Sequence, residues 1–186
     1  MSEFQVEPNF TRGLNLENGK RVILSSLERK DLMDLIGLYN SLVAEDIDIL
    51  QDKQITVDEG AALMEDMLDR MRRGRALALV AEVDGKVVAN ATVVWKSGLM
   101  SHVGEVGVTI HKDYRNRGIG MKMVETLVQL SKERGLKMLQ TSIFRTNAIS
   151  RLLFSNLGFQ EIAMIPKMFH KKGSYIDEVL TVLELK

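Results

Sequence analysis

The chain has 186 residues, of which 45% are hydrophobic and 27% are charged, so it is long enough to bury one core and has the balance of a globular protein. Its 25 basic and 25 acidic side chains cancel, which excludes a general attraction to nucleic acid or to an anionic membrane. The absence of cysteine excludes disulfides, thiolate zinc sites, iron–sulfur clusters and a cysteine nucleophile.

Residues 1–20 are polar and mixed in charge, and we interpret them as a lead-in to a single domain over residues 21–186. They lack the basic and then apolar order of a secretory signal, and no later apolar run reaches the length of a bilayer. We therefore expect a cytoplasmic protein.

The first predicted elements are one strand and two helices. Apolar residues alternate over residues 21–27, as in a strand, and recur at helical spacing over residues 30–43. Thr56 followed by Glu59 is typical of a capping box, which predicts that a second helix begins there.

A β-hairpin is predicted next. Asp84-Gly85 stands between the apolar segments 76–83 and 86–95, and this dipeptide suits the positive φ angles of a tight turn. These two strands should be antiparallel neighbours. A loop then leads into a further strand over residues 103–110.

The stretch Tyr-Arg-Asn-Arg-Gly-Ile-Gly-Met-Lys at residues 114–122 joins this strand to a helix. The first amides of a helix have no partner inside it and its dipole is positive there, so a phosphate fits if the backbone can approach it. Gly118 and Gly120 permit that approach, and Arg115 and Arg117 add positive charge. A tight turn with solvated arginines explains the same residues, so the stretch alone leaves both interpretations open.

The remainder predicts a long amphipathic helix over residues 118–134, a strand over 138–144, a helix over 147–157 and a final pair of strands over 159–169 and 175–185. The whole order predicts an α/β (α+β) fold with a mixed, mainly antiparallel twisted sheet of about seven strands and about four helices. Its centre is one strand–helix–strand unit, which carries the glycine stretch.

Two blocks resemble the GNAT superfamily of acetyl-CoA-dependent N-acetyltransferases. Arg115-x-x-Gly118-x-Gly120 is similar to its pyrophosphate signature, Gln/Arg-x-x-Gly-x-Gly/Ala, and follows a strand as it does in that family. Residues 147–159 are similar to the family's Asn-x-x-Ala-x-x-Leu-Tyr-x-Lys-x-Gly-Phe segment, and the order of elements fits from residue 21 onward. The ending Gly-Ser-Tyr-Ile-Asp at 173–177 resembles branches that acetylate amino-acid-like compounds or protein amines.

The resemblance implies a single GNAT domain in which acetyl-CoA fills a cleft between splayed strands. The strand over residues 108–110 would bond the pantetheine arm through its main chain, the amides of residues 115–121 would hold the pyrophosphate, and no metal is expected. The implied cofactor-binding residues are Val108, Thr109, Ile110, Arg115, Asn116, Arg117, Gly118, Ile119, Gly120, Met121, Asn147 and Phe154.

Acetyl transfer to an amine requires a base, because an alkylammonium has a pKa of about 10.4. Glu105 is the first candidate, and strand alternation directs its side chain away from the face that carries Val106 and Val108. A solvated or structural strand carboxylate is the alternative interpretation of Glu105. Asp177 and Glu178 are the next candidates, with a charged strand edge as their alternative.

The proton donor to the departing thiolate is an open question. The family places a tyrosine where this chain has Phe154, so the proton has to come from water, the substrate ammonium, Ser150 or Tyr175. His102 and His111 could titrate near neutrality, but their loop positions favour exposed side chains. A backbone amide of the 108–110 strand would polarise the thioester, and the amine would attack it directly.

These observations predict an N-acetyltransferase that transfers the acetyl group of acetyl-CoA to a primary amine, with an amino-acid-like small molecule favoured. A protein N-terminus or lysine is the alternative acceptor, and a non-catalytic acyl-CoA-binding module is the alternative of another class. Neither nucleic acid nor a membrane is expected as a partner. Family habit allows a homodimer through the last strands or the first helices.

Overall fold

The computed structural model describes residues 10–15 and 21–186. Within the expected lead-in, residues 1–9 and 16–20 lie outside the described residues, but Thr11–Asn15 forms a strand, β1, which pairs antiparallel with β2 (Arg21–Ser26). The sequence did not predict β1, because its five residues contain one apolar side chain and therefore no periodicity. The expected set of about seven strands thus becomes a sheet of eight among the described residues.

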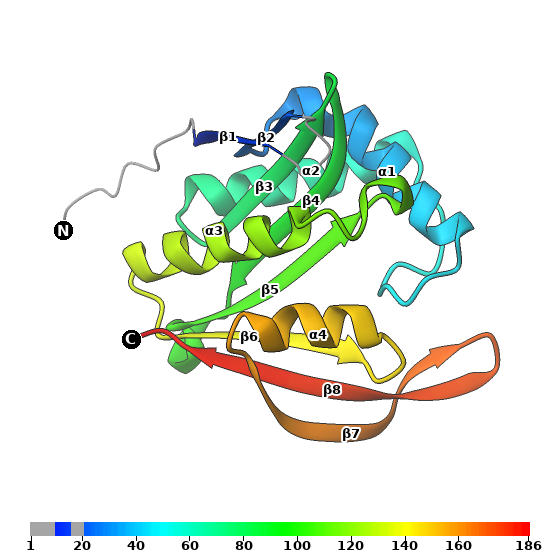
Figure 1. The fold of residues 1–186 in the computed structure, drawn as a ribbon, viewed down its shortest axis with the longest axis vertical. Coiled ribbons are helices and arrows are strands. Elements are labelled where there is room, and N and C mark those ends of the chain that lie inside the picture. The colour runs from blue at the N-terminus through cyan, green and yellow to red at the C-terminus, as the bar shows by residue number, and fades with distance from the viewer. Residues whose placement is uncertain (1–9, 16–20) are drawn as a thin grey trace.

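The sheet has the strand order β1-β2-β3-β4-β5-β6-β8-β7, and all neighbouring pairs are antiparallel except β5 and β6 (Figure 1). The further strands are β3 (Ala76–Val83), β4 (Lys86–Trp95), β5 (Val103–Ile110), β6 (Met138–Phe144), β7 (Gln160–Lys171) and β8 (Ser174–Glu184). The parallel pairing of β5 and β6 covers only residues 103–105 and 138–140. Beyond those residues the two strands diverge.

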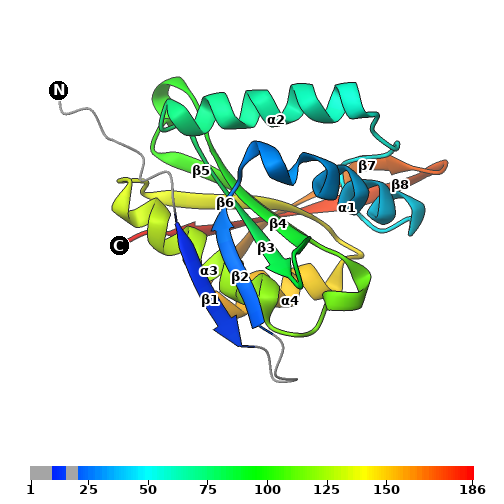
Figure 2. The ribbon, with the colours of Figure 1, turned by 90° about the horizontal axis from the view of Figure 1, so that it is seen from above.

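The described residues form four α-helices, the number predicted, and these helices cover the two faces of the sheet. They are α1 (Leu32–Ala44), α2 (Val57–Arg72), α3 (Ile119–Glu133) and α4 (Ala148–Asn156). Helices α1 and α2 lie on one face, and α3 and α4 lie on the other (Figure 2). Helix α3 is the crossover between β5 and β6, and its buried Met123 and Leu127 belong to the larger hydrophobic cluster.

Two local predictions are confirmed at atomic detail. The Thr56 hydroxyl accepts a hydrogen bond from the Glu59 amide at 3.3 Å, and the Glu59 carboxylate accepts one from the Thr56 amide at 2.8 Å, so the capping box begins α2. Asp84 and Gly85 have φ angles of 52° and 80°, as a tight turn between β3 and β4 requires.

Strand β7 forms an edge of the sheet and is exposed along most of its length. Large apolar side chains stand exposed on it, namely Ile162, Met164, Ile165 and Met168. The homodimer expected through the last strands would use this edge. No helix in the described part of the chain is long and apolar enough to cross a membrane.

Candidate active site

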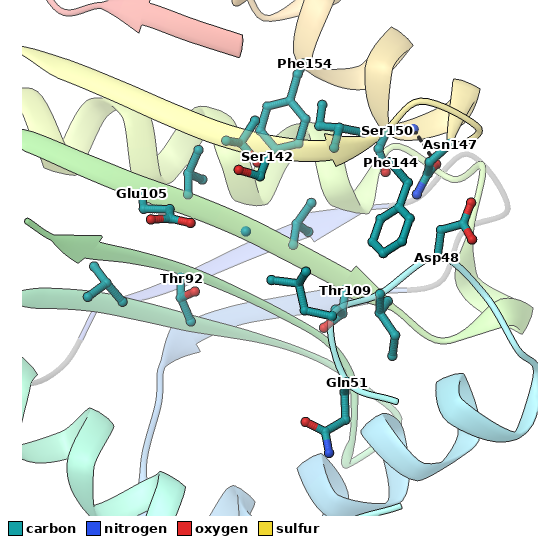
Figure 3. Close-up of a pocket in the computed structure, with 18 of the residues that line it drawn as sticks. Asp48, Gln51, Thr92, Glu105, Thr109, Ser142, Phe144, Asn147, Ser150 and Phe154 are labelled. Atoms are coloured by element: carbon teal, nitrogen blue, oxygen red, sulfur yellow. Dashed lines mark hydrogen bonds between the residues drawn. The ribbon is translucent and has the colours of Figure 1, made fainter. Parts of the chain in front are cut away.

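A cavity of about 490 Å³ opens where β5 and β6 diverge (Figure 3). Its walls come from β4, β5, β6, α4, and α1 with the segment that follows it. On the side that faces β6, the main chain of β5 after Glu105 has no strand partner. An extended ligand can therefore bond there as an additional strand would.

The loop between β5 and α3 presents free backbone amides. Asn116 and Gly118 have φ angles of 58° and 77°, and left-handed residues alternating with ordinary ones turn successive amides into a concave nest. The amides of Asn116, Arg117 and Gly118 donate to no backbone carbonyl of the described residues, and the first helical bond runs from Lys122 to the Gly118 carbonyl at 3.1 Å. This geometry suits an anion.

Gly118 and Gly120 are required in this loop for different structural reasons. A Cβ atom on Gly118 would meet nothing within 4 Å, so its positive φ alone requires glycine. A Cβ atom on Gly120 would lie 2.8 Å from Ile110 Cδ1 and 2.9 Å from Leu153 Cδ1. Glycine at position 120 therefore allows α3 to pack against β5 and α4. The sequence interpretation had instead explained this glycine by the close approach of a phosphate.

Part of the charge that the sequence assigns to this loop is neutralised by pairing. The Arg115 guanidinium donates to both carboxylate oxygens of Glu45, at 2.5 and 2.6 Å, and its Nε donates to the Ile110 carbonyl at 3.0 Å. This pair holds the pKa of the Glu45 carboxyl below its ordinary value. Lys122 pairs with Glu125, whereas Arg117 lies 5.5 Å from the centroid of the Tyr114 ring and has no ion pair among the described residues. The positive potential of the loop therefore comes from the backbone amides and Arg117.

The segment of residues 45–52, which follows α1, is fixed over one end of the cavity. Lys171 Nζ, at the end of β7, donates to the Asp46 and Ile47 carbonyls at 2.7 and 2.8 Å and to Asp48 Oδ1 at 3.2 Å. The Thr146 hydroxyl donates to Asp48 Oδ2 at 2.5 Å. These bonds place Asp48 in the lining of the cavity.

Glu105 extends into the cavity from near one end of the β4–β5 pair, where it lies opposite Val94 (Figure 3). Its side chain is exposed and the side chain of Val106 is 2% exposed, so the predicted alternation of the two faces is confirmed. The Glu105 carboxylate has no hydrogen bond or ion pair with any residue that the structure describes. It is therefore free to bind a ligand N–H.

The other carboxylates proposed as bases are already engaged. Asp177 accepts hydrogen bonds from the Lys167 amide at 3.0 Å and from Arg145 at 3.1 Å, which together hold the pKa of Asp177 below its ordinary value. Glu178 is 4% exposed and accepts a hydrogen bond from the Ser142 hydroxyl. Neither carboxylate lines the cavity itself.

His102 and His111 lie outside the cavity lining. His102 is exposed as predicted, whereas His111 is half-buried. His111 Nδ1 accepts a hydrogen bond from the Asp113 amide at 3.4 Å, and the carbonyl of His102 accepts one from the Lys137 amide at 2.9 Å. No group of three or more histidine, aspartate and glutamate side chains in the described residues could hold a metal ion.

Helix α4 brings the other expected site residues to the cavity. Asn147 caps α4 by accepting a hydrogen bond from the Ser150 amide at 3.0 Å, and Phe154 is 3% exposed and lies edge-on to Phe159. Ser150 lines the cavity, whereas Tyr175 stands exposed on β8 against His170. Of the two side chains considered as thiol proton donors, only Ser150 reaches the cavity.

Among the expected cofactor residues, Val108, Thr109, Asn147 and Phe154 line the cavity, and Ile110 and the 115–121 loop continue from the end of β5 beyond it. The sequence interpretation missed Thr92, Lys96 and Ser142, which also line it. Strand register explains Thr92, because it lies opposite Gly107 on the strand beside Glu105. The pairing of β4 residues with β5 residues cannot be predicted from the sequence pattern within either strand.

Residues 44–159 match the acetyltransferase (GNAT) family, a stretch that covers more than half of the chain. The chain is 25% identical over 158 residues to the L-methionine sulfoximine/L-methionine sulfone acetyltransferase of Pseudomonas aeruginosa, covering 83% of this chain and 88% of that protein. It is 27% identical over 164 residues to the L-amino acid N-acyltransferase MnaT of Escherichia coli K12, covering 85% of this chain and 90% of that protein.

The fold is also similar to that of a solved structure with a bound donor. The structure of yncA from Salmonella typhimurium, which contains its cofactor acetyl-CoA, superposes with a TM-score of 0.79 at 23% identity. The match covers 89% of this chain and 94% of that one. The strand order and the two helical layers described above are therefore those of a known architecture.

Proposed function

Because the chain belongs to the acetyltransferase (GNAT) family, we propose that it uses acetyl-CoA to acetylate the primary amine of a small, amino-acid-like molecule. The observation that carries this proposal is the cleft at which β5 and β6 diverge, since it combines an unpaired strand edge with the free carboxylate of Glu105. The activities named for the two relatives, on L-amino acids and on methionine derivatives, support this class of acceptor.

The residues present suit the donor. The nest of amides over residues 116–121 receives the pyrophosphate, and the free edge of β5 at Val108, Thr109 and Ile110 binds the pantetheine arm. Asn147, at the start of α4, and Phe154, in its last turn, lie along the arm. Acetyl-CoA supplies the acetyl group as a thioester, and a β5 amide polarises the thioester carbonyl.

Glu105 acts as the base on the other side of the cleft. It accepts a proton from the acceptor ammonium, so that the neutral amine can attack the thioester carbonyl directly. No cysteine is available as an acyl nucleophile in this chain, which favours direct attack in a ternary complex. As the thiolate leaves, the attacking nitrogen loses its second proton. The thiolate takes a proton from that nitrogen, from water or from Ser150, because Phe154 cannot donate one.

Lys96 supports an acceptor that carries a carboxylate as well as an amine. It is the only basic side chain among the described residues that line the cavity, and it has no ion pair with any of them. Asp48 and Glu105 are the acidic side chains of the same lining. An α-amino acid can place its ammonium at the carboxylates and its carboxylate at Lys96.

An acceptor screen tests the proposed function. Release of free thiol from acetyl-CoA is measured with L-amino acids, amino-acid amides and peptides that carry a free N-terminus or a lysine, while calorimetry measures acetyl-CoA binding separately. We expect turnover to be fastest with free amino acids or their close analogues. Turnover confined to peptides would favour the protein-acetylating alternative. Tight acetyl-CoA binding without turnover of any amine would instead favour a non-catalytic binding module.

Replacing Lys96 by methionine should separate the carboxylate of the acceptor from its amine. Loss of a charge-assisted hydrogen bond should raise KM for a free amino acid about tenfold or more, and should leave KM for the matching amino-acid amide unchanged. Steady-state kinetics with both compounds measures the difference. Lys86→Met is the control, because Lys86 is exposed at the other end of β4 and outside the cavity. Equal KM values for wild type and Lys96→Met would remove Lys96 from acceptor binding.

A further inference from the structure

Strand β6 carries a polar side chain that the activity proposed above does not use. Ser142 lines the cavity from β6, the strand that diverges from the strand of Glu105 (Figure 3). Its hydroxyl donates a hydrogen bond to Glu178 Oε1 on the neighbouring strand β8. The pair therefore connects the cavity surface to a carboxylate behind it.

The carboxylate of Glu178 is buried and incompletely paired. The residue is 4% exposed, and its Oε2 atom is buried without a hydrogen-bond partner among the described residues. A buried polar atom without a partner costs free energy, so a carboxylate at this position needs a compensating role. Its one hydrogen bond leads to Ser142 and so to the ligand cavity.

This bond determines which hydrogen bonds Ser142 can still make. A serine hydroxyl has one proton to donate and two lone pairs that accept. Because the Ser142 hydroxyl donates its hydrogen bond to Glu178, only the lone pairs of Ser142 Oγ are available to the cavity. A hydrogen bond to a carboxylate also polarises the hydroxyl, which makes its oxygen a stronger acceptor for the N–H of a cation.

We propose that Ser142 accepts a hydrogen bond from the amine of the acceptor substrate and that Glu178 is a positioning residue, which keeps the Ser142 hydroxyl in its accepting orientation. This inference rests on the proposed function and deepens it. A primary ammonium has three N–H groups, so one can bond to Glu105 and another to Ser142 on the two diverging strands. The site therefore selects protonated primary amines over neutral hydroxyl acceptors and over tertiary amines.

Two substitutions test the pair. Ser142→Ala removes the accepting oxygen, and Glu178→Gln places an amide donor beside Ser142, so that the hydroxyl can turn and donate toward the cavity. Each should raise KM for the amine about tenfold or more, since a hydrogen bond to a charged group is lost, and should leave KM for acetyl-CoA unchanged. Ser142→Thr keeps the hydroxyl and should restore the wild-type KM for the amine.

The matched control is Thr181→Val. Thr181 is also buried on β8 and also has an unpaired hydroxyl, but it lies an odd number of residues from Glu178 and hence on the opposite face of the strand. Its replacement should change neither KM. The double variant Ser142→Ala/Glu178→Gln should have a KM for the amine no higher than that of the single variant with the higher KM, because both changes remove the same interaction.

The possible outcomes separate the two proposals. An active wild-type enzyme whose amine KM is unchanged in Ser142→Ala and Glu178→Gln would overturn the role of the pair and leave the proposed function intact. Parallel changes in both KM values and in Tm would also overturn it, since they indicate a structural role. A wild-type protein that acetylates no amine would overturn both proposals. If Glu178→Gln does not fold, Ser142→Ala at the cavity surface still decides the question.

Discussion

Replacing Glu105 with glutamine should lower kcat for a primary amine by about two orders of magnitude or more, the usual size of a general-base contribution. Glutamine keeps the shape of the side chain but cannot accept a proton. Because Glu105 has no partner among the described residues, its replacement breaks no internal hydrogen bond and should leave Tm and KM for acetyl-CoA unchanged.

The pH dependence of this variant gives a sharper measurement than its rate at one pH. The acceptor amine loses its proton without a base as the pH rises toward the amine's own pKa, so the deficit of Glu105→Gln should shrink toward that pH. Rates of thiol release for wild type and variant, measured at saturating substrates across pH, give the ratio directly. Glu82→Gln removes a carboxylate from β3 outside the cavity and should keep the wild-type profile. A full rate for Glu105→Gln at every pH would exclude Glu105 as the base.

The choice of Glu105 over the other carboxylates follows from their partners in the structure. Asp177 on β8 accepts hydrogen bonds from Lys167 on β7 and from Arg145, which follows β6, and these bonds suit a structural role. Glu178 reaches the cavity only through Ser142. The sequence placed all three carboxylates on strands near the expected acceptor and could order them only by the family resemblance, because their hydrogen-bond partners come from other strands.

Local patterns were enough to predict most of the fold. The bounds predicted for β5 and β6 agree with the structure at both ends, because apolar strands bounded by turn residues carry a strong local signal. Strand β1 was missed because it has little apolar pattern and exists by pairing with β2. The glycine loop was predicted because its residues are contiguous in the chain.

The acceptor half of the candidate site could not be predicted in the same way. Ser142 and Glu178 are 36 residues apart in the chain, and their contact depends on β8 entering the sheet between β6 and β7. Arg115 and Glu45 are 70 residues apart, and their ion pair depends on where α1 ends over the sheet. Contacts of this kind follow from the register and order of strands, which periodicity within one element does not specify.

Replacing Gly118 with valine should raise the Kd for acetyl-CoA about tenfold or more. A β-branched residue is strongly disfavoured at φ 77°, so the loop should turn and its amides should no longer converge on the pyrophosphate. Each lost hydrogen bond to a charged phosphate weakens binding further. Isothermal titration calorimetry with acetyl-CoA measures the change without any acceptor, so this result does not depend on turnover.

Gly135→Val is the matched control for this experiment. Gly135 follows α3 at its other end, has a φ of 81° and, like Gly118, has nothing within 4 Å of the position of an added Cβ. Both variants carry the same kind of backbone strain and should lose similar amounts of thermal stability, but only Gly118→Val should lose affinity for acetyl-CoA. Unchanged affinity in Gly118→Val, or equal losses in both variants, would contradict the assignment of this loop to the pyrophosphate.

Gly120 should behave differently from Gly118, although the two stand in one motif. An added Cβ would press on Ile110 and Leu153, so Gly120→Ala should disturb the packing of α3 against β5 and α4. Its Tm and its affinity for acetyl-CoA should therefore fall together. In Gly118→Val the affinity for acetyl-CoA should fall further than in the Gly135→Val control, even where the two variants lose the same Tm. The reason is that Gly118 shapes the amides that receive the phosphates, whereas Gly120 supports the strand and helix that carry those amides.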